Sequence, residues 1–289
     1  MPYIGRFAPS PTGPLHLGSL VAALGSYLDA RAHSGQWQLR IDDLDPPREA
    51  RGARTQIPAQ LRAHGLHWDG PIRHQSQHLN SYQKHLTQLT KAGQTYRCQC
   101  PRQRLRTLQG RYDGHCRTRQ ITNPDSALRL RFDRAPSWQD LLHGRQQPTA
   151  TELGGDFIIQ RRDGLISYQL ATAVDDAPPG ITHVLRGADL LESTARQIHL
   201  QQCLNLPTPT YGHLPLIRTS SGDKLSKQTG APPLDTAQAA ANLIAALKLL
   251  GQPTPPKMRH QPCAQILQQA TAHWNRASVP RADVPPSQC

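Results

Sequence analysis

The sequence is poor in acidic residues, in cysteine and in long apolar runs. Its 289 residues include 20 Asp and Glu against 33 Lys and Arg, a formal net charge of +13. This balance argues for a polyanionic partner such as nucleic acid, bound with salt-dependent affinity. No run approaches the ~20 apolar residues of a membrane span, and no secretory signal opens the chain. Six cysteines in so long a chain do not indicate a disulfide framework, so we expect a cytoplasmic protein without membrane contact.

The N-terminal stretch predicts a strand, a turn and a helix that together bind phosphate. An apolar run at 3–7 is typical of a buried strand, and prolines and a glycine then end it. From about Leu15, apolar residues recur at i, i+3, i+4 and i+7, which predicts an amphipathic helix. Its start offers free backbone N–H groups and a positive dipole end, with His16 able to donate to a phosphate oxygen. The small residues that leave room for a base or ribose are Gly13, Gly18 and Ser19.

A second motif, K-L-S-K-Q at 224–228, carries Lys224 and Lys227 on a loop of small residues. Two such lysines can neutralise pyrophosphate as it leaves the α-phosphorus of ATP, and charge stabilisation of this kind is usually the largest catalytic contribution. An isolated K-x-x-K pair is more often a solvated one. The catalytic interpretation therefore depends on the phosphate-binding turn upstream in the chain.

Together the two motifs resemble the HIGH and KMSKS motifs of class I aminoacyl-tRNA synthetases. The first is spelled H-L-G-S at 16–19, and the second has Leu for Met and Gln for the last Ser. The preceding R-F-A-P-S-P-T-G at 6–13 is similar to the glutamyl and glutaminyl branch. The resemblance implies activation of L-glutamate by ATP with Mg²⁺, with His16 and Lys227 as catalytic residues. The ATP-binding residues that it implies are Thr12, His16, Gly18, Ser19, Lys224 and Lys227.

An acidic run at 42–45 follows a predicted strand. From the residues alone it indicates either a metal site or a solvated loop, at a strand end where ligands bind. The family has I-E-D-x-D-P-x-R here, which implies that Asp42, one methylene shorter than Glu, contacts the α-ammonium of the amino acid. The resemblance also implies that Tyr168 hydrogen-bonds the amino acid and that Arg6 and Arg186 bind its side-chain carboxylate, discriminating against glutamine. The implied glutamate-binding residues are Arg6, Phe7, Ala8, Pro9, Ser10, Asp42, Tyr168 and Arg186.

A cysteine cluster fits a small structural zinc site. Cys98 and Cys100 form a C-x-C pair, and fifteen residues separate Cys100 from Cys116. Three reduced, buried cysteines are the alternative. On spacing alone the fourth ligand stays open between His115, which directly precedes a ligand, and Tyr112. Subgroups of the glutamyl-type synthetases carry a C-x-C…Y-x-x-x-C zinc site, and this resemblance implies Tyr112.

The segment from about 97 to 150 is rich in arginine. In this fold class it is an insertion that holds the acceptor arm of tRNA, so the cluster favours contact with an RNA backbone over general surface charge. After it, strands are predicted at 156–160 and 166–170, paired around the turn at Asp163-Gly164. The arginines of the insertion are Arg97, Arg102, Arg104, Arg106, Arg111, Arg117, Arg119, Arg129, Arg131, Arg134 and Arg145.

The expected fold is therefore α/β: a Rossmann-type parallel sheet of class I synthetase kind, an inserted zinc-containing acceptor-binding subdomain and a short helical stem-contact region. The expected boundaries are 1–95 and 176–228 for the two halves of the catalytic domain, 96–175 for the insertion and 229–289 for the last region. Outside the N-terminal helix, helices are predicted at 55–64, 80–92, 191–204 and 236–250, and further strands at 37–41 and 211–217. The tail beyond carries no clear pattern.

The 61 residues after Gln228 are too few for an anticodon-binding domain. With F-A-P-S-P-T-G-P-L-H and the zinc pattern, this length resembles the truncated family members that transfer glutamate to queuosine at the wobble position of tRNA(Asp). The resemblance implies that the anticodon loop enters where an acceptor end normally sits, and we expect a monomer. Two alternatives remain: a minimal glutamyl-tRNA synthetase charging the 3′ end of tRNA(Glu), and a non-catalytic tRNA-binding paralogue.

Overall fold

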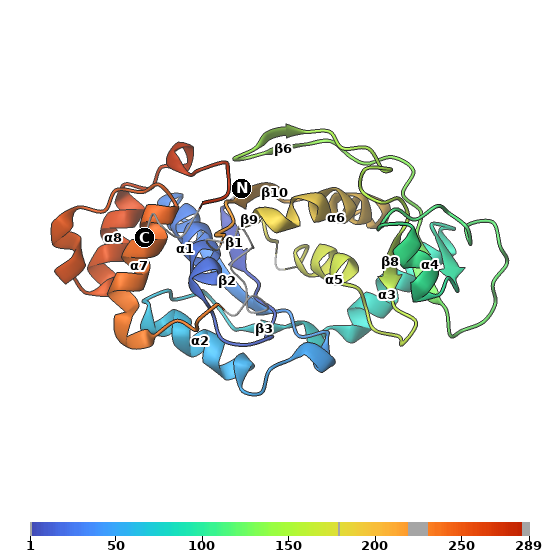
Figure 1. Cartoon of the computed structure of the whole chain (residues 1–289), viewed down its shortest axis with the longest axis horizontal. Helices are drawn as coiled ribbons and strands as arrows, with labels where there is room; N and C mark the ends of the chain where they lie inside the picture. The colour runs from blue at the N-terminus through green and yellow to red at the C-terminus, as the bar shows by residue number, and fades with distance from the viewer. Residues whose placement is uncertain (1, 179, 219–230, 285–289) are drawn as a thin grey trace.

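Parallel strands lie at the centre of an elongated molecule in the computed structural model, which describes residues 2–178, 180–218 and 231–284 (Figure 1). Three pair in the order β1-β2-β3, and two more pair as β10-β9, all of them parallel. The two groups meet where the Thr182 N–H donates to the Ile4 carbonyl at 2.9 Å, so β1 lies between β2 and β9. The parallel strands are β1 Ile4–Phe7, β2 Gln36–Ile41, β3 Arg73–His74, β9 His183–Gly187 and β10 Thr210–Leu214.

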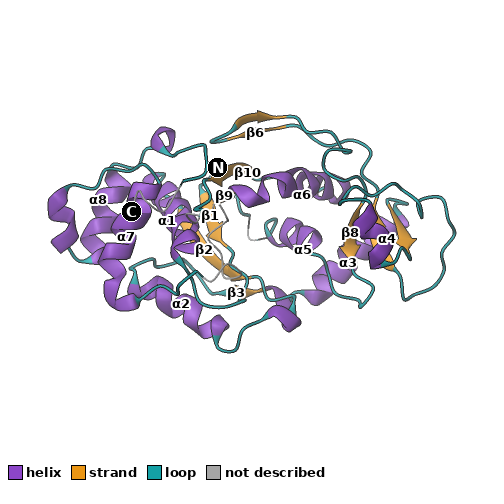
Figure 2. Ribbon diagram, viewed as in Figure 1, coloured by secondary structure: helices purple, strands orange, loops and turns teal. Residues whose placement is uncertain are grey.

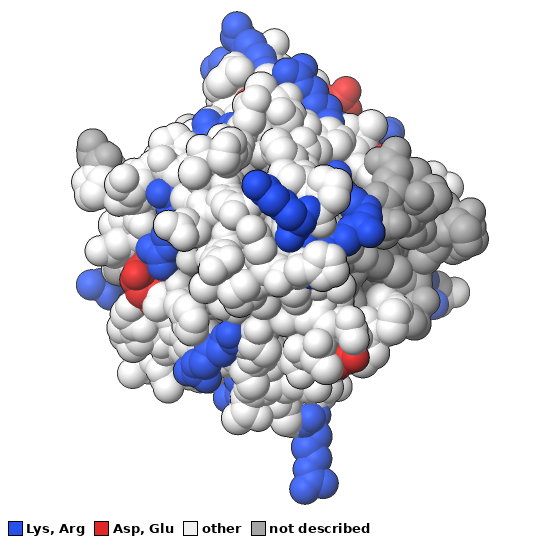
Figure 3. Space-filling model, turned by 90° about the vertical axis from the view of Figure 1, so that its left-hand side faces the viewer, with Lys and Arg blue, Asp and Glu red and all other residues white. Residues whose placement is uncertain are grey.

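Helix α1, Leu17–Ala32, packs between these strands and two C-terminal helices. Its apolar face is buried as predicted, and Gly25 allows the close approach to β10, because a Cβ there would lie 2.8 Å from a methyl group of Leu214. Helices α7, Ala239–Leu249, and α8, Cys263–Ala272, cover its outer side. Figure 3 views this end of the molecule, where basic side chains are scattered and acidic ones are fewer.

The insertion forms a second group of strands at the opposite end of the molecule (Figure 2). Its antiparallel sheet, in the order β4-β5-β8, shares a second apolar core with α3, α5 and α6. A hairpin of β6 and β7 reaches back to the parallel strands, where the Leu141 N–H donates to the Tyr211 carbonyl at 2.9 Å. The strands of this half are β4 Thr95–Cys98, β5 Ala127–Leu130, β6 Trp138–Asp140, β7 Gly144–Gln146 and β8 Phe157–Gln160.

Most predicted helices are confirmed to within a few residues. The prediction of a parallel sheet is confirmed as well, and the tail beyond 250 contains a helix, α8, that no sequence pattern indicated. Among the described residues, none of the helices combines the length and the apolar character that crossing a bilayer requires. The remaining helices are α2 Ala53–Ala63, α3 Leu79–Lys91, α4 Arg102–Thr107, α5 Tyr168–Asp175 and α6 Leu191–Leu204.

The predicted strand at 166–170 is wrong. Ile166 makes one isolated bridge to Gln160, and Tyr168 then begins α5. Ser167 caps this helix, because its hydroxyl accepts the Leu170 N–H at 3.4 Å. A serine before an alanine-containing stretch is a helix start, whereas the prediction gave more weight to the apolar alternation. The turn at Asp163-Gly164 is confirmed, since the Arg161 N–H donates to the Leu165 carbonyl at 2.8 Å.

Candidate active site

A cavity of about 920 Å³ opens at the carboxyl ends of β1 and β2, beside the point where the strand order changes direction. In sheets of this kind ligands bind at such a crevice. The β1–α1 turn, the loop after β2, the end of β8 with the start of α5, and the 3₁₀ turn Ala188–Leu190 form its walls. The predicted site residues that line it are Ala8, Ser10, Thr12, Asp42 and Tyr168.

The turn into α1 has the predicted form, and His16 is its N-cap. The Ser19 N–H donates to His16 Nδ1 at 3.3 Å, and the His16 N–H donates to the Ser19 hydroxyl at 3.5 Å. This reciprocal pair is a capping box. Because Nδ1 accepts a hydrogen bond, the neutral imidazole carries its proton on Nε2. Backbone geometry therefore fixes both the ring orientation and the tautomer of His16.

A cluster of buried charges, called the floor below, extends behind the cavity wall from Asp42, which lines the cavity. Arg40 donates from Nε to Asp42 Oδ1 and from Nη1 to Asp176 Oδ1, each at 2.6 Å. Arg6 donates to both oxygens of Asp176, at 3.2 and 3.1 Å. Burial acts to raise the pKa of Asp176, but the guanidinium groups of Arg6 and Arg40 lower it to about 2. For Asp42, burial raises the pKa and outweighs Arg40. This floor holds two cations and two carboxylates together.

A third carboxylate, that of Asp175, adjoins this floor. It accepts hydrogen bonds from the Gln75 amide at 2.8 Å and from the Tyr82 hydroxyl at 2.7 Å, and lies 4.0 Å from Arg40 Nε. Neither Arg40 nor Tyr82 was predicted as a site residue. The signal for Arg40 was present in the sequence, since this charged residue lies between the apolar Leu39 and Ile41 at the end of the strand Gln36–Ile41, which two aspartates follow. A cation in that position needs buried carboxylates as partners.

Arg186 is buried behind the cavity, with only 4% of its surface exposed. Its guanidinium donates to the Gln197 side chain at 2.7 Å and to the Thr194 hydroxyl at 2.8 Å. It also donates to the carbonyl of Leu190, a residue that lines the cavity, at 3.3 Å. The predicted glutamate-binding residues therefore divide into a lining group and a supporting group. The supporting residues, which do not line the cavity among the described residues, are Arg6, Phe7, Pro9 and Arg186.

The cysteine cluster lies in the insertion, away from this cavity. The sulfur atoms of Cys98, Cys100 and Cys116 lie within 4.8 Å of one another, and all three residues are buried. The Tyr112 hydroxyl is 3.5 Å from Cys98 Sγ and 3.9 Å from Cys100 Sγ. It also accepts the Cys116 N–H at 2.9 Å. His115 is exposed and is not part of the group. The three sulfurs and the phenol oxygen thus occupy one small volume.

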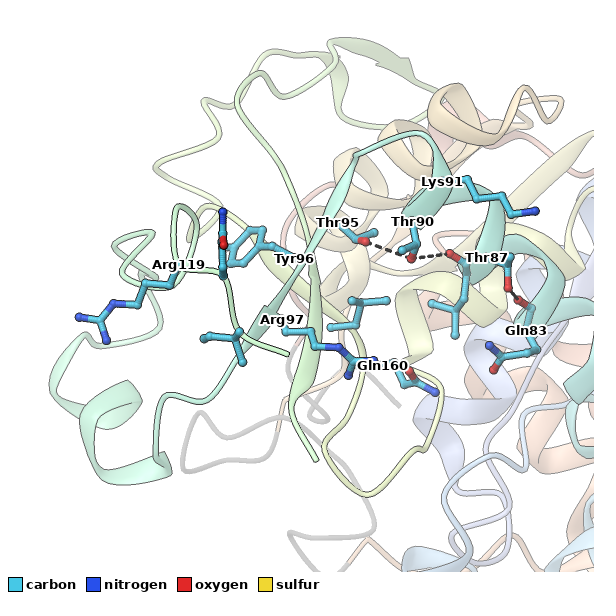
Figure 4. A pocket seen from close by; sticks show the side chains of 13 residues that line it. Gln83, Thr87, Thr90, Lys91, Thr95, Tyr96, Arg97, Arg119 and Gln160 are labelled. Carbon is cyan, nitrogen blue, oxygen red and sulfur yellow. Dashed lines mark hydrogen bonds between the residues drawn. The ribbon is translucent and has the colours of Figure 1, made fainter. Parts of the chain in front are cut away.

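A smaller pocket of about 450 Å³ lies between α3 and the antiparallel sheet of the insertion (Figure 4). The threonine hydroxyls around it have local partners: Thr90 bonds Thr95 at 3.1 Å and the Leu86 carbonyl at 2.9 Å. Lys91 and Arg119 point away from each other in Figure 4. No predicted ATP, glutamate or zinc residue lines this pocket among the described parts of the chain. It is therefore a surface feature of the insertion, separate from the main cavity.

Comparison with known proteins identifies the family. The model of the tRNA synthetases class I (E and Q), catalytic domain, matches residues 4–242. The chain belongs to this family. The resemblance of the two motifs to glutamyl-type class I synthetases is thereby confirmed.

Individual relatives and a solved structure show which members of the class I family this chain is similar to. The Glutamyl-Q tRNA(Asp) synthetase of Pectobacterium atrosepticum is 49% identical over 279 residues, covering 96% of this chain and 87% of the relative. The protein of the same name from Pseudomonas aeruginosa is 45% identical, covering 99% and 98%. Among solved structures, a glutamate tRNA ligase from Elizabethkingia meningosepticum in complex with its amino acid matches with a TM-score of 0.82 at 25% identity, covering 99% of this chain and 67% of that one.

Proposed function

We propose that this class I synthetase activates L-glutamate with ATP and transfers the glutamyl group to queuosine at the wobble position of tRNA(Asp). The observation that carries the choice of acceptor is the 49% identity, over 96% of the chain, to relatives named Glutamyl-Q tRNA(Asp) synthetase. The cavity at the strand ends, lined by the turn before α1 and by Asp42 and Tyr168, supports the activation step.

In the first step the α-carboxylate of glutamate attacks the α-phosphorus of ATP, and pyrophosphate leaves. No general base is required, because this carboxylate is ionised at pH 7. The proton on His16 Nε2 is available to stabilise charge on the α-phosphate, together with the N-terminus of α1. Mg²⁺ enters with ATP. Lys224 and Lys227, proposed to stabilise the pyrophosphate, lie outside the described residues. In the second step a hydroxyl of the queuosine ring attacks the activated carboxyl carbon of glutamyl-adenylate; an ester forms, the bond to the phosphate breaks, and AMP and the hydroxyl proton leave.

For glutamate, we propose that Asp42 and Tyr168 contact the backbone part of the amino acid from the cavity wall. Arg6 and Arg186 provide positive charge beneath and behind that wall, which favours a side-chain carboxylate over the neutral amide of glutamine. The buried pairing of Arg6 with Asp176 fixes its guanidinium in one orientation. The same charge-assisted geometry keeps the pocket preorganised before the ligand arrives.

We further propose that Cys98, Cys100, Cys116 and Tyr112 hold one structural Zn²⁺. In a tetrahedral site with Zn–S bonds near 2.3 Å, ligand atoms are roughly 3.5–3.8 Å apart. The Cys100–Cys116 sulfur distance of 3.5 Å and the two Tyr112 distances of 3.5 and 3.9 Å fit this spacing. Deprotonated cysteine sulfurs are donors that zinc prefers, and the Tyr112 oxygen is the fourth donor that the family resemblance implies. Zinc would cross-link the ends of a loop that has only a small apolar core.

The insertion is the proposed contact for the RNA backbone. Several of its arginines are exposed and available to phosphates, whereas Arg129 is 5% exposed and stacks on the Tyr112 ring at 3.7 Å. The proposed domain boundaries remain those expected from the sequence, with the protein acting as a monomer in the cytoplasm. The exposed arginines of the insertion are Arg102, Arg106, Arg111, Arg119, Arg134 and Arg145.

The test supplies labelled glutamate, ATP and Mg²⁺ with three acceptors: tRNA(Asp) containing queuosine, the same tRNA without queuosine, and tRNA(Glu). We expect label only on the first, and glutamate-dependent ATP–pyrophosphate exchange without any tRNA. Label on tRNA(Glu) instead would identify a minimal charging enzyme. Salt-dependent tRNA binding without exchange or label would identify a non-catalytic paralogue.

A further inference from the structure

A histidine and an aspartate that belong to none of the predicted motifs lie directly behind Arg186. His213, on β10, places its Nδ1 2.6 Å from Asp140 Oδ2, and both side chains have 0% exposure. Asp140, at the end of β6, also accepts the N–H groups of Leu142 and His143 on Oδ1, each at 3.0 Å. Burial raises the pKa of this carboxylate, but the hydrogen bonds from His213 and from the two backbone N–H groups together lower it below its usual value, so Asp140 stays ionised.

The other ring nitrogen of His213 faces Arg186. Arg186 Nε–H, which can only donate, lies 3.3 Å from His213 Nε2, and the Thr194 hydroxyl lies 3.0 Å from the same atom. His213 Nε2 must then be an acceptor without a proton. The ring proton is consequently on Nδ1, where it is donated to Asp140. Burial lowers the pKa of His213, which keeps the ring neutral beside the guanidinium.

We propose that Asp140 and His213 are positioning residues that orient Arg186 for recognition of the substrate's side-chain carboxylate. Asp140 selects the Nδ1–H tautomer, and this tautomer presents a lone pair to Arg186 Nε–H. With Nε, Nη1 and Nη2 each engaged by His213, Gln197 and Thr194 in turn, the guanidinium has one orientation. The proposal rests on the proposed role of Arg186 in binding glutamate.

The chain of contacts from Asp140 through His213 to Arg186 is called the relay below. Its effect on Arg186 can be tested separately from the packing of the β6–β7 hairpin against β10. Backbone contacts attach β6 and its turn to β10: the Leu141 N–H donates to the Tyr211 carbonyl at 2.9 Å. His143 Nε2 also bonds the His213 carbonyl at 3.0 Å. These contacts do not depend on the charge of Asp140. An isosteric change at Asp140 therefore alters the tautomer of His213 while leaving the fold in place.

The first variant is Asp140→Asn. Its Oδ1 can still accept the two backbone N–H groups, but its amide then turns a donor toward Nδ1 and moves the histidine proton to Nε2. Two donors would face each other between His213 and Arg186, so the guanidinium must shift. We expect the KM for glutamate to rise at least tenfold, the KM for ATP to stay within twofold, and the preference for glutamate over glutamine to fall.

A matched pair of variants at His213 tests whether an acceptor atom at the place of Nε2 is what matters, rather than the volume of the ring. The side-chain oxygen of Gln in His213→Gln can occupy the place of Nε2 and accept from Arg186, whereas the shorter Asn in His213→Asn cannot reach it. We expect the Gln variant to keep a glutamate KM within about threefold of wild type, and the Asn variant to behave like Asp140→Asn. Asp156→Asn is the control, because Asp156 is a buried carboxylate that bonds Tyr96 at 2.7 Å in the insertion, without contact to Arg186.

Nuclear magnetic resonance of ¹⁵N-labelled histidine reports the tautomer without reference to any activity. We expect Nδ1–H for His213 in the wild type and Nε2–H in Asp140→Asn. Wild-type His213 with its proton on Nε2 would overturn the relay. A tautomer switch without change in glutamate KM or in the glutamate-to-glutamine ratio would overturn its role in recognition. Wild-type protein lacking glutamate-dependent exchange would instead remove the proposed function, whatever the tautomer.

Discussion

Two regions of the molecule, the floor beneath the cavity and the thiol cluster of the insertion, hold buried polar groups in opposite ways. Beneath the cavity, each charge has a partner of opposite sign: Arg40 bridges Asp42 and Asp176, and Arg6 pairs with Asp176. In the insertion, the side chains of Cys98, Cys100, Cys116 and Tyr112, called the thiol cluster or thiol group below, lie close together. The apolar core around them is small and consists largely of these same residues. In the floor, protein side chains alone balance the buried charges. In the thiol group, by contrast, the close approach of deprotonated sulfurs is favourable only when a divalent cation binds them. One region is therefore stabilised by charge pairing, whereas the other would be stabilised by the metal proposed for it.

The largest effect should follow from breaking the paired region. Arg40→Met leaves Asp42 without its cation and Asp176 with Arg6 alone, and loss of one partner in such a buried network costs about 3–5 kcal/mol. We expect urea unfolding to show this loss, and glutamate activation to disappear. Arg48→Met is the control, because Arg48 makes an exposed pair with Asp45 that contributes about 1 kcal/mol or less. Equal losses in the two variants would contradict the account of the floor.

Removing a ligand from the thiol group should have the next largest effect. Wild-type protein should contain one zinc per chain by elemental analysis. Cys116→Ser should lose most of it and loosen the insertion, because metal binding and local folding are coupled. Cys203→Ser changes a half-buried thiol outside the group and should keep the zinc. Full zinc content in Cys116→Ser, or none in the wild type, would refute the zinc site.

The stability of the fold should depend on pH because the buried His213, beside the parallel strands, is neutral. His213, facing Asp140, Arg186 and His143, has a lowered pKa in the folded state because of burial. Protonation below its unfolded pKa of about 6.5 therefore favours unfolding, and stability should fall as pH decreases from there. One such group contributes up to about 1.4 kcal/mol per pH unit. Urea midpoints measured between about pH 7.5 and 5.5 should fall less steeply for His213→Gln; parallel curves would contradict this assignment.

The smallest effects should come from exposed cations of the insertion. Arg106→Gln and Arg119→Gln should each weaken tRNA binding slightly and reduce the slope of log K against log salt by about 1. Glutamate-dependent exchange should not change. Arg62→Gln, on α2 with its guanidinium over the Trp68 ring, serves as the control distant from the insertion. Unchanged salt slopes in both insertion variants would assign RNA contact to another surface.

Local patterns predicted most of the framework. The turn before α1 was predicted from its prolines, glycines and apolar spacing, and the helix Leu191–Leu204 was predicted at the bounds observed. The thiol group was legible because its ligands lie within nineteen residues of the chain. The helix start at Ser167 was missed because the alternation of apolar residues at 166–170 was interpreted as a strand, whereas the Ser167 side chain caps a helix there.

The rest depends on contacts between distant segments. Asp140 and His213 are 73 residues apart, and Arg40 and Asp176 are 136 apart, so neither pairing leaves a local pattern. The sequence indicated which charged residues lie near the cavity. Only the fold shows which of them line the cavity and which are buried behind it and hold the lining residues in place. Arg6 and Arg186 were expected to touch the ligand directly, and the fold holds both in buried hydrogen-bond networks behind the cavity lining.

We propose that the two regions carry out different steps: the paired region would activate glutamate, and the insertion, with its proposed zinc, would position the RNA. The most direct measurement compares two reactions on one preparation, before and after zinc is removed with a chelator and the chelator is dialysed away. The account predicts that glutamate-dependent ATP–pyrophosphate exchange remains within about twofold, while transfer to queuosine-containing tRNA(Asp) is lost and returns with added zinc. Parallel loss of both reactions, or loss of neither, would contradict it.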